Sequence, residues 1–213
     1  LVPFTTYAFT DLLALKAGTK GLRTTISTAC SSSSTAIGMG AEWVRRRFCD
    51  IVITGGSESL SETTFAGFNS LRAVDEVPCR PFDRERRGIS LGEGAAIMII
   101  EEYNHAQMRG AKIYAEVLGY GISSDAYHVT APEPQGTGIL QAIEMAMRNS
   151  GGDKGEIQYI NAHGTGTPAN DLAETNAVKR FFGRSAYNIP ISSTKSMVGH
   201  CLGAAGAVEA VAA

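Results

Sequence analysis

The stretch ISTACSSSS, residues 26–34, decides how the rest of this chain is interpreted. Residues 22–28 alternate β-branched and polar side chains, which predicts a strand, and residues 35–47 predict a helix built on small residues. Cys30 therefore falls at a strand-to-helix turn. At a helix N-terminus, unpaired backbone N–H groups and the helix dipole favour a thiolate, so the position suits a nucleophile. A packed core thiol is the alternative that this segment leaves open.

The composition of the 213-residue chain is that of an ordinary globular protein, with 44% hydrophobic and 19% charged residues. A formal net charge of −2 gives no electrostatic reason to expect nucleic acid as a partner. No apolar run reaches the ~18 residues that span a bilayer, and the N-terminal residues lack the pattern of a signal peptide. We therefore expect a cytoplasmic protein without a membrane partner.

The cysteines and the two ends of the chain add further expectations. The spacing of the cysteines is neither C-x-x-C nor that of a disulfide scaffold, so we expect four reduced thiols, Cys30, Cys49, Cys79 and Cys201. The chain starts without Met and stops within the small-residue helical pattern of residues 203–213. We expect it to be an internal fragment of a longer protein.

Helical and strand patterns alternate along the remaining sequence. Further strands are expected over residues 51–54, 95–100, 112–120, 157–162 and 189–194. Further helices are expected over residues 4–16, 101–109, 139–147, 171–182 and 203–213. Residues 57–87 show weak periodicity and are expected to be loop. The alternation predicts the α/β class with a mainly parallel sheet.

Reactive side chains follow three of the predicted strands. Cys30 follows the first strand, His163 follows residues 157–162, and Lys195 with His200 follows residues 189–194. In a parallel sheet the carboxyl ends of the strands lie at one edge, where ligands collect. We therefore expect one site to hold all four side chains.

The histidines have plainer interpretations when each is taken alone. The stretch NAHGTGT, residues 161–167, could cradle a phosphate, but it lacks the glycine spacing of a dinucleotide site and the Lys-Ser/Thr ending of a P-loop. His163 or His200 singly fits a structural histidine. A zinc site from Cys30, His163 and His200 also stays open, although no pair has local ligand spacing.

Three motifs, in order, resemble the active-site motifs of the β-ketoacyl-[acyl carrier protein] synthases, condensing enzymes of the thiolase-like superfamily. They are TACSSS at 28–33, NAHGTGT at 161–167 and STKSMVGH at 193–200. The similarity also includes PFD at 81–83, GEG at 92–94, SSDAYH at 123–128 and GAAGA at 203–207. It implies the layered αβαβα thiolase-like fold, incomplete here because family members are longer. Residues 1 to about 110 would form the end of the N-terminal half, and about 111–213 much of the C-terminal half.

The resemblance implies an acyltransferase that works by a ping-pong condensation in fatty acid elongation. Cys30 would take an acyl group from a phosphopantetheine thioester, and malonyl-carrier protein would then lose carbon dioxide. His163 and His200 would meet the oxyanion that develops on the malonyl thioester. The carbanion would attack acyl-Cys30 and give a 3-oxoacyl chain. The only cofactor implied is the phosphopantetheine carried by the acyl carrier protein, and no metal is implied.

Supporting roles follow from the same resemblance. Lys195 is similar to the family's active-site lysine, with Glu174 as its partner in ordering the site. Thr165 and Thr167 match threonines that contact the pantetheine arm.

Two more residues match the family at the substrate entrance. Thr130 lies in residues 125–130, which resemble a loop that gates the acyl tunnel and contacts the substrate. Arg72 is similar to a basic residue that docks the acidic acyl carrier protein, although a solvated surface charge fits equally well. The resemblance also implies a homodimer, with the strand before Cys30 at its interface.

Other functions remain open at the level of sequence. The serines of residues 31–33 favour the ketosynthase of a polyketide synthase, whereas residues 123–130 and the motifs at His163 and Lys195 favour fatty acid elongation, which we prefer. From a different class, a chain-length-factor-like partner would shape the tunnel without catalysis, but such subunits lack the nucleophile that Cys30 supplies. A non-enzymatic nucleotide-binding module is the remaining alternative.

Overall fold

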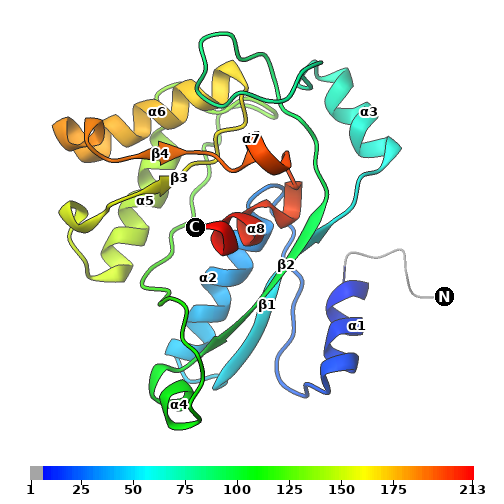
Figure 1. Ribbon diagram of the computed structural model, residues 1–213, viewed down its shortest axis with the longest axis vertical. Helices are drawn as coiled ribbons and strands as arrows, with labels where there is room; N and C mark the ends of the chain where they lie inside the picture. Colours follow the sequence, from blue (N-terminus) through cyan, green and yellow to red (C-terminus); the bar gives the residue numbers. More distant parts are fainter. Residues whose placement is uncertain (1–6) are drawn as a thin grey trace.

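The computed structural model describes residues 7–213, whose arrangement is drawn in Figure 1. The helices are α1 (Ala8–Ala17), α2 (Ser32–Arg45), α3 (Glu62–Ser70), α4 (Tyr103–Met108), α5 (Thr137–Ser150), α6 (Pro168–Phe182), α7 (Lys195–Val198) and α8 (Ala205–Ala212). The strands are β1 (Ile51–Glu58), β2 (Gly94–Glu101), β3 (Ile160–Asn161) and β4 (Ile191–Ser192). Among the helices of the described residues, none combines the length and apolar character needed to cross a membrane.

The helices expected from periodicity are confirmed, with shifts at their ends. The one expected over residues 35–47 is α2, which starts three residues earlier at Ser32. The one expected over residues 4–16 is α1, and residues 4–6 of that prediction lie outside the described residues.

The prediction of a mainly parallel sheet is wrong for the longer of the two strand pairs. Strands β1 and β2 pair antiparallel from Ile51 opposite Glu101 to Glu58 opposite Gly94, whereas the short β3 and β4 pair parallel. A continuous apolar run indicates that both faces of a strand are covered, but it carries no information on direction. Here residues 59–93 lead the chain back, so β2 runs against β1 (Figure 1).

Two expected strands form no ladder. Residues 22–27 and 111–126 have no regular secondary structure. The alternation of side chains predicted strands with one apolar and one polar face, but a strand also needs a neighbouring backbone to accept and donate hydrogen bonds. Within residues 7–213 neither segment has such a neighbour; the carbonyl of Leu118 instead accepts a hydrogen bond from Arg45 Nη2 at 3.1 Å.

Helix α3 lies inside the region that was expected to be loop. Its N-terminus is capped by Ser61, whose Oγ accepts a hydrogen bond from the backbone N–H of Thr64 at 3.1 Å. No residue of α3 is buried, so the helix lacks the core-facing stripe on which a periodicity argument depends. The serine cap followed by Glu62 was the available signal.

Small residues let α2 and α8 pack closely against β1 and β2, which fixes the start of α2. The Oγ of Ser33 accepts a hydrogen bond from the N–H of Ala207 in α8 at 3.0 Å. A Cβ on Gly56 of β1 would lie 2.8 Å from the Cβ of Ser33 and 2.9 Å from the Cα of Ala204. Because Cys30 lies two residues before α2, this packing also places the thiol.

Substituting Gly56 by alanine is expected to lower the free energy of unfolding by about 1–3 kcal/mol, because backbone and short side chains would have to move. Equilibrium denaturation by urea measures the change. The matched control is Gly67→Ala in α3, where nothing lies within 4 Å of the added Cβ. That control is expected to be neutral or to stabilise by up to about 1 kcal/mol, and equal losses in both variants would contradict the packing argument.

Candidate active site

The turn that carries Cys30 is held by its own hydrogen bonds. Ala29 has a φ of +51°, a left-handed conformation that a non-glycine residue rarely adopts. The Oγ of Ser32 accepts from the N–H of Thr28 at 2.9 Å and donates to the carbonyl of Ala29 at 2.7 Å. These bonds stabilise the sharp turn between residues 22–28 and α2, with the thiol at its tip.

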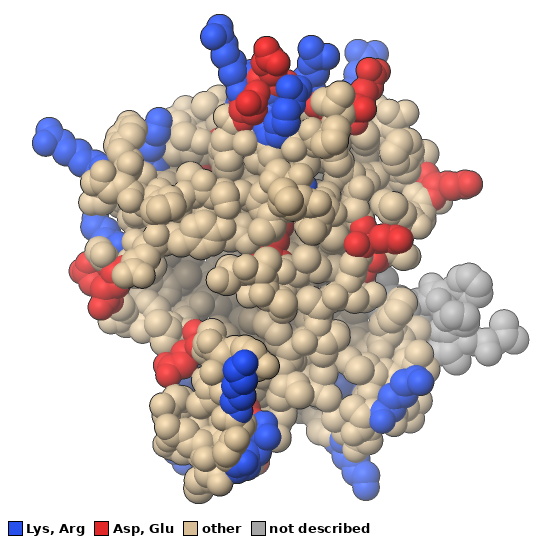
Figure 2. Space-filling view, in the orientation of Figure 1, with Lys and Arg blue, Asp and Glu red and all other residues tan. Residues whose placement is uncertain are grey.

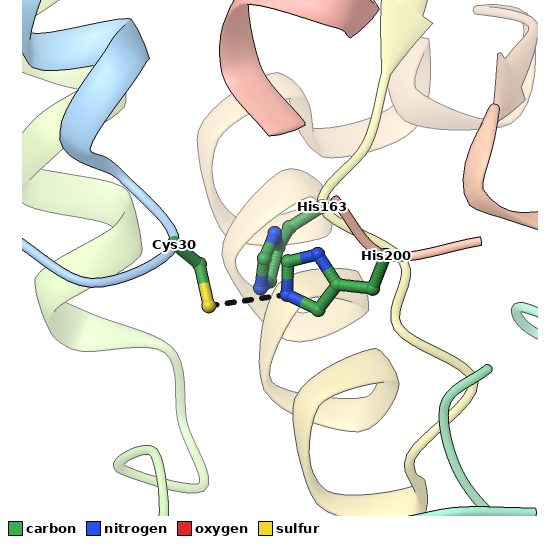
Figure 3. Close-up of side chains that lie close together, drawn as sticks. All are labelled: Cys30, His163 and His200. Atoms are coloured by element: carbon green, nitrogen blue, oxygen red, sulfur yellow. Dashed lines mark hydrogen bonds between the residues drawn. The ribbon is translucent and has the colours of Figure 1, made fainter. Parts of the chain in front are cut away.

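The structure brings Cys30 together with both histidines (Figure 3). The Sγ of Cys30 lies 3.1 Å from Nε2 of His200. The rings of His163 and His200 meet edge to face, with centroids 5.2 Å apart and an interplanar angle of 81°. The three side chains come from the turn before α2, the loop after β3 and the segment after α7. Residues far apart in the sequence therefore form one cluster.

The backbone around His200 determines which of its ring nitrogens carries the proton. Nδ1 accepts a hydrogen bond from the N–H of Leu202 at 3.2 Å, so in the neutral ring the proton is on Nε2. Nε2–H then points at the sulfur of Cys30. His200 is arranged as a hydrogen-bond donor to a negative atom, not as a base that removes the thiol proton.

The same hydrogen bond weighs against the zinc alternative. Cys30, His163 and His200 form the only group of three potential metal ligands within residues 7–213, with ligand atoms within 4.8 Å of one another. A metal on Nε2 of His200 would require the proton on Nδ1, which would then face the N–H of Leu202. Two opposed donors disfavour that arrangement.

Burial controls the protonation of all three groups. It lowers the pKa of His163 to about 3, helped by the Lys195 charge. It also lowers the pKa of His200 to about 3, helped by His163 and Lys195. Burial raises the pKa of the Cys30 thiol more than Lys195 and the backbone N–H lower it. The pKa shift therefore favours the thiol over the thiolate at rest, because burial outweighs the opposing Lys195 charge and backbone N–H.

The buried imidazoles predict an acid-sensitive fold. Between pH 3 and 6.5 the unfolded chain binds protons that native His163 does not, so the free energy of unfolding falls as the pH falls, by about 1.4 kcal/mol per pH unit. His163→Asn is expected to reduce the slope by this amount, measured by urea denaturation at several pH values. The difference between the two slopes excludes the contribution of the buried carboxyl groups, which both proteins share. His128→Asn, on an exposed loop, is the control; an unchanged slope for His163→Asn would refute the assignment.

Lys195 is buried, with 1% of its side chain exposed, but its partner is not the one expected. Its Nζ pairs with Oε1 of Glu209 in α8. Glu174 instead accepts hydrogen bonds from the backbone N–H groups of His163 at 2.6 Å and Gly164 at 2.8 Å. The predicted pairing of Lys195 with Glu174 is thus corrected: Glu209 compensates the lysine charge, and Glu174 holds the histidine loop.

Glu209 is a residue that the sequence analysis missed. Burial raises the pKa of its carboxyl group, and the Lys195 ammonium opposes that shift. The available signal was its position as the only charged residue of the apolar segment AGAVEAVA in α8. A carboxylate inside an apolar helix needs a buried cation or donor, because an unpaired buried charge is costly.

The remaining predicted residues divide into two groups. Thr165 is buried, and its Oγ1 lies 2.8 Å from Oγ1 of Thr167, so the threonine pair adjoins His163 in the same loop. Arg72 and Thr130 are exposed, and within residues 7–213 neither makes a hydrogen bond or ion pair with the Cys30 cluster. On the face drawn in Figure 2, acidic and basic side chains are interspersed around the edges instead of forming one basic surface.

A thiol beside two neutral imidazoles, at a strained turn before a buried helix, can carry a covalent group next to hydrogen-bond donors for a developing oxyanion. Comparisons with known proteins agree with this. The model of "Beta-ketoacyl synthase, N-terminal domain" matches residues 10–106, and that of "Beta-ketoacyl synthase, C-terminal domain" matches residues 114–213. The chain belongs to the beta-ketoacyl synthase family, which confirms the resemblance stated from its motifs.

Curated relatives and solved structures cover nearly the whole chain. It is 47% identical over 208 residues to 3-oxoacyl-[acyl-carrier-protein] synthase 2 of Synechocystis sp., covering 94% of this chain and 50% of that protein. It is 45% identical to the protein of the same name from Staphylococcus aureus, covering 95% and 52%. The chain thus spans about half the length of the curated relatives it matches.

Two solved ketosynthases share the fold. One, a type II polyketide synthase acyl-carrier protein in complex with its ketosynthase, matches with a TM-score of 0.95 and 38% identity over 98% of this chain and 53% of that chain. The ishigamide ketosynthase/chain length factor matches with a TM-score of 0.93 and 38% identity over 98% and 51%. The expected thiolase-like α/β fold is confirmed, and it is partial in this chain.

Proposed function

We propose that this chain carries the active site of a 3-oxoacyl-acyl carrier protein synthase, an acyltransferase that condenses an acyl group on Cys30 with malonyl-acyl carrier protein. The observation that carries the proposal is the 3.1 Å approach of Nε2 of His200 to Sγ of Cys30, with His163 edge-on beside it. The names of the curated relatives support fatty acid elongation as its setting.

The first half-reaction is a thioester exchange at Cys30. The sulfur attacks the acyl carbonyl of a phosphopantetheine thioester, a new C–S bond forms, and the pantetheine sulfur leaves with the proton that the thiol gives up. Nε2–H of His200 and the charge of Lys195 stabilise the sulfur while it is negative. Because one thioester replaces another, the acyl group stays activated for the next step.

The second half-reaction uses the histidines as donors. As malonyl thioester loses carbon dioxide, negative charge moves to its carbonyl oxygen, and Nε2–H of His200 together with the ring of His163 stabilises that oxygen. The carbanion then attacks the acyl-Cys30 carbonyl, and the thiolate leaves. Donors that are neutral and buried suit this step, because a low dielectric strengthens each hydrogen bond without adding a competing proton.

The remaining assignments concern the substrate arm, the carrier protein and the oligomer. Thr165 and Thr167 hold the pantetheine arm, Arg72 meets the acyl carrier protein, and Thr130 lies in the loop that covers the tunnel. The similar ketosynthase that was solved in complex with its acyl-carrier protein supports the carrier protein as partner. Residues about 1–110 and 111–213 belong to the two halves of the fold. A homodimer through the unpaired segment before Cys30, and a cytoplasmic location, stay predictions.

Intact mass spectrometry tests the proposal. The complete polypeptide that contains this chain is exposed to saturated and β-oxygenated acyl carrier proteins, with Cys30→Ala as the control. A saturated acyl adduct on the wild type alone supports fatty acid elongation. Preference for oxygenated chains would favour the ketosynthase of a polyketide synthase, the kind of protein named for the neighbour with a TM-score of 0.95. No adduct on either protein would refute the covalent mechanism and leave a non-catalytic partner subunit.

A further inference from the structure

The loop that carries His163 is anchored at its two ends by different carboxylates of α6. Glu174 accepts the N–H groups of His163 and Gly164 at 2.6 and 2.8 Å. Asp171 accepts the N–H of Gly166 at 3.2 Å. Different carboxylates therefore hold the catalytic end of the loop and the threonine end, and the amide of Asn170 joins the two, donating to Oδ1 of Asp171 at 3.1 Å and to Oε2 of Glu174 at 3.4 Å.

Asp171 also ties in a second segment. Its side chain is only 1% exposed, and its Oδ2 accepts the N–H of Phe82 at 2.7 Å and faces Nε of Arg86 at 3.3 Å, an ion pair without hydrogen-bond alignment. The guanidinium of Arg86 donates to the carbonyl of Asp83 at 2.7 Å and to that of Pro168 at 3.4 Å. One arginine thus joins its own turn to the start of α6.

The segment of residues 82–88 lies close against the loop at two glycines, Gly164 and Gly166. Phe82 has a φ of +64°, which is rare for an aromatic residue, and its ring would lie 3.0 Å from a Cβ on Gly164. Gly166 has a φ of +78°, and a Cβ there would lie 2.7 Å from the carbonyl of Gly88. Strain of this kind persists only where surrounding contacts hold it, and it concentrates at functional sites.

We propose that Arg86 is a positioning residue: through Asp171 and Pro168 it sets the Thr165–Thr167 end of the loop, and so the binding of the pantetheine arm, without touching the chemistry at Cys30. The contact with Pro168 is next to Thr167, whose Oγ1 pairs with that of Thr165. The proposal deepens the function given above and rests on it.

The test compares Arg86→Gln with Arg84→Gln in the complete polypeptide. Arg84 is an exposed residue of the same segment, so the control removes the same charge without the contacts. The substrates are an acyl-pantetheine thioester and a malonyl-pantetheine thioester, which complete the turnover without docking of a carrier protein; KM is measured for the acyl thioester. For Arg86→Gln we expect KM to rise about tenfold and kcat to change by less than about twofold, the pattern of binding that is lost equally in the ground state and the transition state. Arg84→Gln is expected to leave both unchanged.

A second readout separates positioning from general damage. Iodoacetamide alkylates Cys30 without using the arm, so its rate is expected to be the same in wild type and Arg86→Gln. An unchanged KM, an equal effect of Arg84→Gln, or a fall in kcat and alkylation rate together would overturn the proposal. If Arg86→Gln does not fold, Arg86→Lys is used, because it keeps the charge facing Asp171 but not the two carbonyl contacts. Its KM must lie above the wild-type KM and below ten times that value. A wild type that transfers no acyl group would instead refute the proposed function.

Discussion

Replacing Cys30 with alanine is expected to reduce condensation by about 10⁴-fold or more, while decarboxylation of malonyl-acyl carrier protein stays detectable. Condensation needs the sulfur to carry the acyl group. Decarboxylation needs only donors for the developing oxyanion, which His163 and His200 still supply. Mass spectrometry of the 3-oxoacyl product and measurement of released carbon dioxide follow the two activities in the same sample.

The control for this variant is Cys49→Ala, which removes a half-buried thiol that the site does not use. It is expected to retain both activities. If Cys30→Ala lost decarboxylation as completely as condensation, the division of roles between the thiol and the histidines would be wrong.

Replacing Glu209 with alanine is expected to lower the free energy of unfolding by about 3–5 kcal/mol. Lys195 has 1% of its side chain exposed and would be left as a buried cation without its counter-charge. Urea denaturation monitored by circular dichroism measures the loss.

Two further variants show whether the loss comes from the unpaired charge. The double substitution Lys195→Met with Glu209→Leu removes both charges and is expected to recover most of the stability, because apolar replacement of a buried pair is often neutral. Glu42→Ala, which removes an exposed pair with Arg45 and Arg46, is expected to cost less than about 1 kcal/mol. A double variant as unstable as Glu209→Ala would contradict this explanation.

The sequence was sufficient for the parts of the site that depend on short motifs. Cys30, His163, His200 and Lys195 each follow a predicted strand or turn, and their motifs lie in the family's order, so their convergence could be expected. The partner of Lys195 could not be chosen in the same way. Glu174 and Glu209 are both carboxylates on helices, and only the packing of α8 against the sheet brings Glu209 to the lysine.

The fold shows a similar limit. Helix α6, with a buried face, and α5, whose apolar residues are half-buried, were predicted from their apolar spacing, whereas α3 has no buried residue and shows only weak periodicity. The antiparallel pairing of β1 with β2 was missed because side-chain patterns report burial and not strand direction. Residues 22–28 and 112–120 have the alternation of strands, yet a ladder also requires a second backbone, which a pattern along one segment cannot reveal.

The hydrogen bond from Leu202 to His200 also sets a rule for inhibitors. Because Nδ1 is occupied as an acceptor, the imidazole offers visiting molecules a donor at Nε2 and no lone pair. A compound that presents a carbonyl, sulfonyl or lactam oxygen to this nitrogen gains a hydrogen bond to a buried donor. An otherwise identical compound with an N–H at that position places two donors against each other and loses about 1–3 kcal/mol of binding free energy. Inhibitors of this site should therefore carry a hydrogen-bond acceptor opposite Nε2.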